Sequence, residues 1–277
     1  MVVRTKAEVR RAVAAMRPQR IALVPTMGYL HEGHLSLVDR ARELADRVVL
    51  SIFVNPLQFG PQEDLDRYPR DLERDVELAT GRGVDLIFAP DVREMYPGGE
   101  PIVRVVPGRL AETLCGAYRP GHFEGVLTVV AKLFGIVRPD VAVFGQKDFQ
   151  QAVLIRRMVA DLDLGIEIDV APIVREPDGL AMSSRNVYLS PEERESALGL
   201  YRGLTHAAEA FAGGERDAER LRRLVHEELA RPGVRVQYVE VVDPETLQPT
   251  QPASPGNVLA VAAFVGQTRL IDNVILM

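Results

Sequence analysis

Two histidines spaced three residues apart are the first feature of the sequence that could do chemistry. His31 and His34 lie in PTMGYLHEGHLSL (residues 25–37), between an apolar run that suits a buried strand and a run with helical periodicity. A helix N-terminus presents unpaired backbone N–H groups and a partial positive charge, which favour anions. Gly28 and Gly33 let the backbone approach a ligand closely. The pattern predicts two imidazoles that donate hydrogen bonds to a phosphate and to the charge of a transition state.

Two alternative roles of the histidine pair stay open. Zinc sites of the HExxH type place their histidines four residues apart, whereas the spacing here is HExH, and no cysteine–histidine cluster supplies further ligands. Metal ligands are therefore unknown. Alternatively, both histidines are structural residues of a turn. Against a purely structural role, two of the chain's five histidines fall in one glycine-flanked loop after a buried strand.

Lys147 lies in a second segment of interest, FGQKDFQQ (residues 144–151), at the end of a predicted strand. Of 33 basic residues only Lys6, Lys132 and Lys147 are lysines, a bias that a GC-rich genome or a hot habitat explains equally. A flexible ammonium group suits a phosphate as a point charge. Asp148 could accept ribose hydroxyls or orient a cation. A solvated turn is the alternative for this segment.

Polar residues also gather in two further loops. LAMSSRN (residues 180–186) offers two hydroxyls and an arginine that can hold polyphosphate oxygens, although a serine-rich interdomain loop that caps a helix explains it as well. VNPLQFGPQEDLDRYPR (residues 54–70) places Asn55 and Gln58 just past a strand end, where they could bind substrate hydroxyls or a carboxylate. Such loops are often merely turns.

The order of the predicted elements indicates the fold that would position these residues. Apolar runs that suit buried strands alternate with helical patterns, and this order predicts an α/β fold with a parallel sheet and helices on both faces. The predicted strands cover residues 20–24, 48–54, 84–89, 141–144 and 166–170, and the predicted helices cover residues 34–45, 62–80, 126–137 and 149–162.

Near Ile173 the pattern changes, and a smaller α+β domain is predicted. Ser190 is a good N-cap, because Pro191 follows at the first helical position and Glu193 stands three residues on. We expect a catalytic domain over residues 1–175 and a smaller domain over residues 176–277. The second is predicted to contain helices over residues 191–212 and 215–230 and strands over residues 234–242, 258–265 and 270–276.

Composition narrows the class of protein. The chain has 277 residues, 47% hydrophobic and 26% charged, which is ordinary for a globular protein with a sizeable core. Its formal net charge of -6 argues against a nucleic-acid partner. Cys115 is the single cysteine, so an intrachain disulfide is excluded and a reducing compartment is favoured. The sequence shows neither a signal-peptide core nor an apolar run of membrane-spanning length, so we expect a cytoplasmic protein without a membrane partner.

Motifs that are missing exclude other enzyme classes. The sequence has no GxGxxG, which leaves a dinucleotide dehydrogenase little support, and no Gly-Lys pair, which excludes a P-loop. It also lacks the GxSxG nucleophile elbow. The remaining chemistry is phosphate binding at strand ends of an open α/β sheet.

Taken together, the motifs resemble those of a known family. PTMGYLHEGHLSL resembles the HIGH-type loop of the nucleotidyltransferase superfamily, and LAMSSRN resembles its KMSKS-type loop, with arginine where the superfamily name has lysine. With VNPLQFG, YRPGHFEGVLTVVAKLF and FGQKDFQQ in this order, the chain from about residue 20 onward resembles the pantoate–β-alanine ligase family. The resemblance implies a Rossmann-like domain with a smaller C-terminal lid, a homodimer, and ATP with Mg²⁺.

The resemblance also implies a two-step reaction and a set of site residues. Pantoate carboxylate would attack the α-phosphorus of ATP, and the amine of β-alanine would then attack the resulting pantoyl adenylate and release AMP. The catalytic residues implied are His31, His34, Lys147 and Arg185. The ATP site would comprise Pro25, Thr26, Met27, His34, Gly145, Lys147, Asp148, Val174, Met182, Ser183, Ser184 and Arg185. The substrate site would comprise Met27, Asn55, Gln58, Tyr68, Arg119 and Gln151, with Met27 against the gem-dimethyl carbon of pantoate.

Two rival functions share the same residues. A nucleotidyltransferase that stops at nucleotide transfer would take a nucleotide as its second substrate, whereas a ligase needs an amine and releases AMP. A non-catalytic adenine-nucleotide sensor would bind ATP tightly and release no pyrophosphate. Adenylation chemistry itself is physically sensible, because a carboxylate is a poor acyl donor until a phosphate becomes its leaving group. Fixed cationic donors then lower the cost of the charge at the α-phosphorus.

Overall fold

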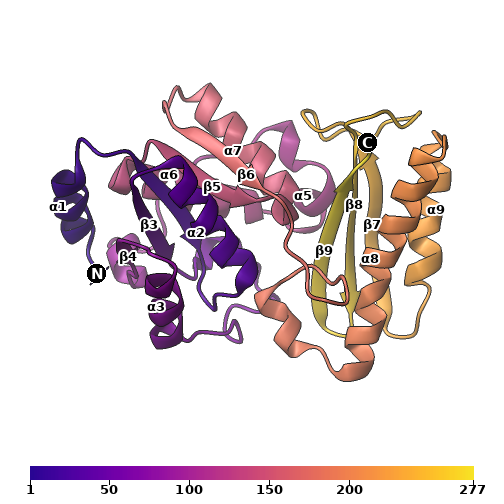
Figure 1. Cartoon of the computed structure of the whole chain (residues 1–277), viewed down its shortest axis with the longest axis horizontal. Helices are drawn as coiled ribbons and strands as arrows, with labels where there is room; N and C mark the ends of the chain where they lie inside the picture. Colours follow the sequence, from indigo (N-terminus) through magenta and orange to yellow (C-terminus); the bar gives the residue numbers. More distant parts are fainter. The chain divides into compact units, whose positions relative to one another are not determined.

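The computed structural model describes all 277 residues, and contacts between its Cα atoms divide the chain into two compact units (Figure 1). The chain passes between the units more than once, because two short segments that precede residue 173 belong to the second unit. The first unit comprises Met1–Gly108, Arg119–Gln146 and Leu154–Pro172, and the second comprises Arg109–Tyr118, Lys147–Val153 and Ile173–Met277. The sequence predicted a single boundary at residue 175, and it did not predict that two earlier segments of the chain belong to the second unit.

The first unit is built on a six-stranded parallel sheet, as expected for the α/β class. Its strands are β1 (Val2–Val3), β2 (Ile21–Thr26), β3 (Arg47–Ile52), β4 (Leu86–Phe88), β5 (Val141–Gly145) and β6 (Glu167–Ala171). They lie in the order β1-β4-β3-β2-β5-β6. Along β2, successive side chains point to opposite faces, and Ile21, Ala22, Leu23 and Val24 are each 0% exposed. Both faces of the sheet are therefore covered, which explains why its strands are continuous apolar runs.

The strand order reverses between β2 and β5, which are neighbours although β3 and β4 separate them in the chain. Ligands of open α/β sheets bind outside the carboxyl ends of the strands at such a point. The strand β2 also runs through Pro25, where the sequence predicted its end. Pairing with β5 involves only Ala22 and Leu23, so the missing N–H of Pro25 costs no hydrogen bond with that neighbour.

Helices and short 3₁₀ turns connect the strands of the first unit. The helix α2 lies against β2, β3 and β5 (Figure 1). Its apolar stripe, with Leu37, Val38 and Ala41, joins strand residues in one buried cluster. The helical segments are α1 (Lys6–Met16), α2 (Glu32–Leu44), η1 (Pro56–Gln58), α3 (Leu72–Gly81), α4 (Val92–Met95), α6 (His122–Val137) and α7 (Phe149–Asp161), the first turn of which belongs to the second unit.

The helix predicted over residues 62–80 is wrong in its first half. Only Leu72–Gly81 is helical, and the residues before it form turns and bends. Pro69 disfavours helical geometry in the residue before it. Asp71 then provides a proper start, because its side chain accepts a hydrogen bond from the N–H of Arg74. The charged stretch 62–70 is therefore a loop.

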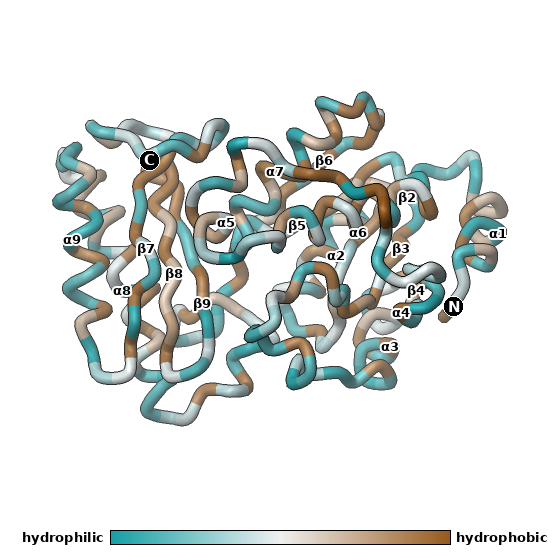
Figure 2. Tube along the Cα trace, turned by 180° about the vertical axis from the view of Figure 1, so that it is seen from behind, coloured by the Kyte–Doolittle hydropathy of each residue, from teal (hydrophilic) through white to brown (hydrophobic).

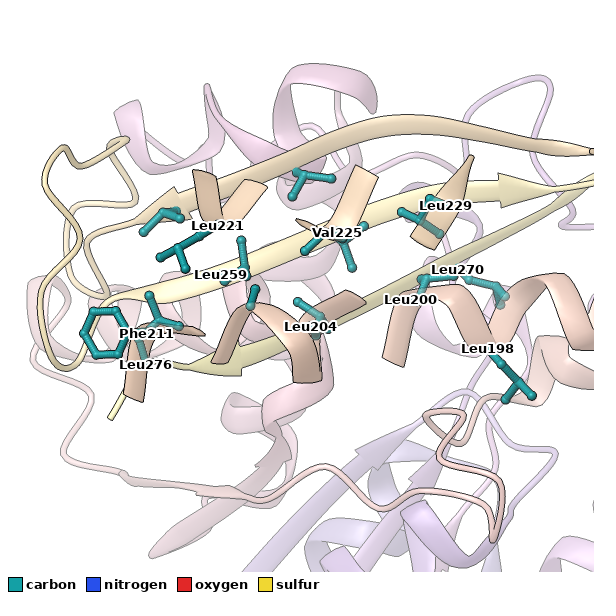
Figure 3. Close-up of a cluster of buried hydrophobic side chains, with 14 of the residues drawn as sticks. Leu198, Leu200, Leu204, Phe211, Leu221, Val225, Leu229, Leu259, Leu270 and Leu276 are labelled. Atoms are coloured by element: carbon teal, nitrogen blue, oxygen red, sulfur yellow. The ribbon is translucent and has the colours of Figure 1, made fainter. Parts of the chain in front are cut away.

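The second unit carries a three-stranded antiparallel sheet on which two helices pack (Figure 1). Leucines from both helices and from β8 and β9 gather in one cluster between the layers (Figure 3). The labelled side chains of Figure 3 that form it are Leu198, Leu200, Leu204, Phe211, Leu221, Val225, Leu229, Leu259, Leu270 and Leu276. The elements are η2 (Arg109–Ala111), α5 (Leu114–Tyr118), η3 (Gln146–Asp148), η4 (Ser184–Tyr188), α8 (Pro191–Ala212), α9 (Ala218–Leu229), β7 (Val234–Val242), β8 (Val258–Val265) and β9 (Thr268–Ile275).

The start of α8 confirms its local sequence signal, and α9 shows an apolar stripe. Ser190 caps α8 in a capping box with Glu193, and Pro191 is the first helical residue, as predicted. Along α9, hydrophobic and hydrophilic stretches alternate in Figure 2, and the buried residues recur every three or four positions. No helix of the chain combines the length and the apolar character that crossing a membrane requires.

Candidate active site

The loop that follows β2 carries the histidine pair and is held by a buried carboxylate. Asp75, which is 1% exposed, accepts hydrogen bonds from the backbone N–H groups of Tyr29 (2.7 Å) and Leu30 (2.6 Å). Burial raises the pKa of the Asp75 carboxyl, although these two N–H groups pull it down. Gly28 has φ +84° and a Cβ there would meet Asp75 Oδ2 at 2.8 Å, so glycine is required for both reasons. Sequence reasoning missed Asp75, whose only signal is an acidic residue on the apolar stripe of α3.

The two imidazoles lie against each other, tilted by 36°, at the N-terminus of α2. Their ring centroids are 4.1 Å apart, and His31 is the N-cap of the helix. Nδ1 of His31 accepts from the N–H of Gly33 (3.1 Å), and Nδ1 of His34 accepts from the N–H of His31 (3.4 Å). A ring nitrogen that accepts carries no proton, so in both histidines the N–H donor is Nε2. The capping contacts therefore fix both rings as neutral donors beside a helix terminus that favours anions.

Gln58 and Met27 meet at the edge of the same loop. The Nε2 of Gln58 lies 3.2 Å from the sulfur of Met27, and both side chains are half-buried. Asn55 is 1% exposed, and its Nδ2 donates to Oε1 of Gln58 (3.1 Å) and to the carbonyl of Gly125 (3.1 Å). Its Oδ1 accepts from the hydroxyl of Tyr96 at 2.8 Å. The structure thus places Asn55 behind Gln58, with its amide already bonded within the protein.

Arg119 is bound to groups that support Gln58 from the other side. Its guanidinium makes two hydrogen bonds to Glu63 (2.7 and 2.6 Å) and contacts Nε2 of His122 at 2.9 Å. Because a guanidinium only donates, Nε2 of His122 accepts and its Nδ1 donates to the carbonyl of Gln58 at 2.8 Å. Burial acts to raise the pKa of the Glu63 carboxyl, but its bonds to Arg119 hold that pKa below the usual value.

Three other expected residues of the first unit are Pro25 and Thr26 in β2 and Tyr68 in the loop before α3. The hydroxyl of Thr26 donates to the carbonyl of Ser51 (2.7 Å) and accepts from the N–H of Gly28 (3.2 Å), so it braces the loop. Pro25 precedes it in the strand and is half-buried. Tyr68 is 5% exposed and meets the ring of Phe59 edge-on at 6.0 Å.

Gly145 ends β5, where it pairs with Ala171 of β6. A Cβ at this position would lie 3.9 Å from the side chain of Leu37, which is an ordinary contact distance. Space inside the unit therefore does not require glycine here. The residue stands at the carboxyl end of the strand next to β2, which is where an open sheet offers its backbone to a ligand.

In the second unit, Lys147, Asp148 and Gln151 lie together at the start of α7, all half-buried. Asn273 of β9 donates to the backbone carbonyl of Lys147 at 3.1 Å. The neighbouring Gln150 is 4% exposed, and its amide donates to two carbonyl groups of the segment Arg109–Tyr118. These anchors hold the short segment Lys147–Val153 within the second unit, and sequence reasoning did not find them.

The segment LAMSSRN (residues 180–186), called the serine–arginine loop below, is shaped by its own hydrogen bonds. Met182 donates through its backbone N–H to the carbonyl of Val174 at 3.0 Å, which closes a hairpin. Ser183 caps η4, because its hydroxyl accepts from the N–H of Arg185 at 3.2 Å. Ser184 is buried in the first turn of that helix. The predicted capping role of this loop is therefore real for Ser183, and it positions Ser184 and Arg185.

The hairpin is tied to the sheet of the second unit by a buried ion pair. Arg175 binds both carboxylate oxygens of Asp272, at 2.6 and 3.0 Å, and Asp272 is 3% exposed. The same guanidinium lies 4.7 Å from the ring centroid of Tyr201. Bidentate pairs of this kind fix geometry as well as energy. Asp272 and Asn273 are thus adjacent residues of β9 that anchor, respectively, the serine–arginine loop and the Lys147 segment.

The two units therefore each assemble a group of the expected residues. The first unit brings together the histidine pair, Met27, Gln58 and Arg119 around the loops after β2 and β3. The second unit holds Lys147, Asp148 and Gln151 at one anchor and the serine–arginine loop at another. Neutral Nε2–H donors at a helix N-terminus, an ammonium group and a guanidinium are the groups that bind phosphate oxygens.

Comparisons with known proteins agree on one family. The family model described as pantoate-beta-alanine ligase matches residues 1–275. The chain is 59% identical over 279 residues to pantothenate synthetase 1 of Bradyrhizobium diazoefficiens, covering 99% of this chain and 98% of the relative.

Solved structures give the same result. The crystal structure of pantothenate synthetase from Thermus thermophilus is 52% identical and superposes with a TM-score of 0.94, covering 99% of both chains. The pantoate-beta-alanine ligase of Francisella tularensis, solved in complex with beta-gamma ATP and beta-alanine, is 33% identical with a TM-score of 0.82, covering 99% of this chain and 97% of that one.

Proposed function

Because the chain belongs to the pantoate–β-alanine ligase family, we propose that it joins pantoate to β-alanine through a pantoyl adenylate. It is an ATP-using ligase that forms pantothenate, and its amide bond is made at the expense of ATP. A relative of the same family was crystallised with beta-gamma ATP and beta-alanine, which supports both substrates.

The first proposed step transfers the adenylyl group. A carboxylate oxygen of pantoate attacks the α-phosphorus of ATP, the bond from that phosphorus to the bridging oxygen breaks, and pyrophosphate leaves. In the second step the amine of β-alanine attacks the acyl carbon, loses a proton, and expels AMP. Adenylation is needed because AMP is a far better leaving group than oxide.

The observation that carries this proposal is the histidine pair at the N-terminus of α2. Both Nδ1 atoms accept backbone N–H groups, so each ring offers an Nε2–H donor in a fixed orientation. Donors fixed in advance stabilise charge that develops in a transition state without reorganisation. We assign His31 and His34 to the α-phosphate, with Lys147 on the phosphates and Arg185 on the β/γ end.

The remaining roles follow the same assignment. We propose that Gln58 and Gln151 hold pantoate, with Met27 against its dimethyl carbon, and that Tyr68, Asn55 and Arg119 shape the substrate end. We propose that ATP is further bound by Pro25, Thr26, Gly145, Asp148, Val174, Met182, Ser183 and Ser184.

We propose that Mg²⁺ arrives bound to ATP as part of that substrate. Magnesium in phosphate-transfer sites keeps several waters and binds through phosphate oxygens with one or two carboxylates. The chain contains no group of three or more His, Cys, Asp or Glu side chains that could hold a metal ion.

A homodimer in the cytoplasm is the proposed working form. One exposed segment supports the dimer: Ile102, Val103 and Val106 are 100, 85 and 71% exposed, which is unusual for three large apolar residues so close together. The single cysteine, Cys115, suits a reducing compartment.

Product analysis tests the proposed reaction. The protein is incubated with ATP, Mg²⁺ and pantoate, with and without β-alanine. We expect one equivalent of pyrophosphate without β-alanine and continuous release of AMP only with it. Transfer to a nucleotide instead of an amine, or ATP binding with no pyrophosphate, would show the two rival functions and refute the ligase assignment.

Two alanine variants test the site. We expect His34→Ala and Lys147→Ala each to slow adenylation at least about tenfold, equivalent to about 1.4 kcal/mol of barrier. His206→Ala is the matched control, because His206 is a half-exposed residue of α8 far along the chain from both loops. If both site variants adenylate pantoate as fast as this control, the residue assignment is wrong.

A further inference from the structure

A chain of three polar side chains leads from the interior of the first unit to the proposed pantoate site. The hydroxyl of Tyr96 donates to Oδ1 of Asn55 at 2.8 Å, and Nδ2 of Asn55 donates to Oε1 of Gln58 at 3.1 Å. Tyr96 is 5% exposed and Asn55 is 1% exposed, whereas Gln58 is half-buried, so Gln58 has the most surface of the three to offer a ligand. In the proposed reaction Gln58 binds pantoate, and Tyr96 has no assigned role.

The hydrogen bonds of Asn55 fix which way its amide points. Its Nδ2 faces the carbonyl of Gly125 at 3.1 Å, and its Oδ1 faces the N–H of Leu57 at 3.3 Å. Turning the amide over would set oxygen against oxygen at Gly125 and N–H against N–H at Leu57. Asn55 therefore presents a hydrogen-bond donor, not an acceptor, to the side chain of Gln58.

The same reasoning fixes Gln58. Its Oε1 is occupied by the donor from Asn55, so its Nε2 turns toward the sulfur of Met27 at 3.2 Å and toward the substrate. The Gln58 subsite then offers a hydrogen-bond donor. Such a subsite recognises an acceptor oxygen of the acid substrate and disfavours a group that can only donate.

We propose that Tyr96 is a positioning residue for acid recognition, which holds Asn55 and thereby keeps the amide of Gln58 with its donor toward the substrate. The proposal rests on the assignment of Gln58 to pantoate. Of the four hydrogen bonds of Asn55, the one from Tyr96 is the shortest. Without it, Oδ1 keeps only the 3.3 Å contact with Leu57, and the amide of Asn55 loses its firmest anchor.

The surroundings of Tyr96 suit a permanent donor. Burial raises the pKa of the Tyr96 phenol, so the hydroxyl keeps its proton across the physiological range. The ammonium group of Lys132 lies 5.5 Å from the ring centroid, and the ring of Phe53 lies at 6.0 Å. Phe53 supports the ring but has no side-chain atom that can hydrogen-bond the hydroxyl, which makes it a control for packing.

The test compares Tyr96→Phe with Phe53→Leu in the full-length chain. Tyr96→Phe removes only the hydroxyl, and we expect it to raise the pantoate KM between about twofold and tenfold, the effect of one net hydrogen bond, with the ATP KM unchanged. Phe53→Leu should lower the Tm and leave both KM values alone. A pantoate KM that stays within error of the parent in Tyr96→Phe, or that rises equally in Phe53→Leu, would overturn the proposal.

A double-mutant cycle separates the positioning role of Tyr96 from the assignment of Gln58 to pantoate. In a Gln58→Ala background, Tyr96→Phe should have no further effect on the pantoate KM, because Tyr96 acts only through Gln58; additive effects would overturn the positioning role. If Gln58→Ala itself leaves the pantoate KM unchanged, the assignment of Gln58 fails instead. Gln58→Glu reports on polarity: it should weaken pantoate more than Gln58→Ala, and a weaker effect than Gln58→Ala would show that the subsite presents an acceptor.

Discussion

Gly125 controls how closely α6 approaches the short helix η1 that carries Gln58. A Cβ added at Gly125 would lie 2.2 Å from the carbonyl oxygen of Leu57 and 2.7 Å from the N–H nitrogen of Gln58. Comfortable contacts of a Cβ begin near 3.4 Å, so Gly125→Ala requires a separation of about 1.2 Å, from 3.4 minus 2.2 Å. The obstacle is backbone, and no side chain can rotate away to relieve it.

The expected cost has two opposing parts. Overpacking of this kind destabilises by about 1–3 kcal/mol. Alanine recovers about 1 kcal/mol of helix propensity relative to glycine. The net loss should therefore be up to about 2 kcal/mol, a fall in Tm of several degrees for a chain of this size. The larger effect is on function, because a shift of about 1 Å in a positioning residue can cost roughly 10²-fold in rate.

Gly135→Ala on the same helix is the matched control, because a Cβ there meets nothing within 4 Å. It should leave activity intact and raise the Tm slightly. Thermal melts and steady-state kinetics with pantoate varied would compare the two variants. We expect Gly125→Ala alone to lose stability and to bind pantoate poorly. If the two variants have the same Tm and the same pantoate KM, the close approach of α6 to η1 is not what holds Gln58 in place.

Two further predictions concern stability. Burial would raise the pKa of the Glu63 carboxyl, but its bonds to Arg119 outweigh burial and hold that pKa below its ordinary 4.5; the folded chain thus binds fewer protons there than the unfolded chain. Glu63→Gln should therefore lower the free energy of unfolding near neutral pH by up to about 1 kcal/mol, which a lower Tm would report. The difference between the variant and the parent should fade as the pH falls through the lowered pKa. A difference that persists far below pH 4.5 would contradict the pairing of Glu63 with Arg119. Ser190→Ala removes the N-cap of α8 and should lower the free energy of unfolding by about 1 kcal/mol, whereas Ser196→Ala, inside the same helix, should not lower it. Equal melting curves for the two variants would show that Ser190 does not stabilise the helix as an N-cap.

Local signals predicted much of the second unit. The strands β7 and β8 and the helix α8 have the bounds expected from the sequence. For α8 the reason is local, because Ser190 and Pro191 mark a helix start without help from tertiary contacts. The parallel sheet was likewise predicted from its apolar runs. The helix predicted from residue 62 began ten residues too early, because a charged stretch with helical spacing was favoured over the restriction that Pro69 imposes.

The site was predictable only as far as its motifs. His31 and His34 stand out in the sequence, because glycines flank them at the end of an apolar run. Asp75, Tyr96 and Gly125 do not, because their roles depend on partners 41 to 70 residues away in the chain. A buried carboxylate, a buried phenol and a close helix contact become meaningful only when the fold brings those partners together. Spacing within a motif carries no information about them.

The way the second unit is assembled has a consequence for the order in which the chain can fold during synthesis. All six strands of the parallel sheet have been made once the ribosome passes Ala171. The segments Arg109–Tyr118 and Lys147–Val153 must wait, because Cys115 finds Tyr238, and Lys147 finds Asn273, only 123 and 126 residues later. A nascent chain can therefore join these two stretches to each other through Gln150, but it lacks their partners in β7 and β9 until those strands have emerged, and we expect chaperones to bind the two stretches until then.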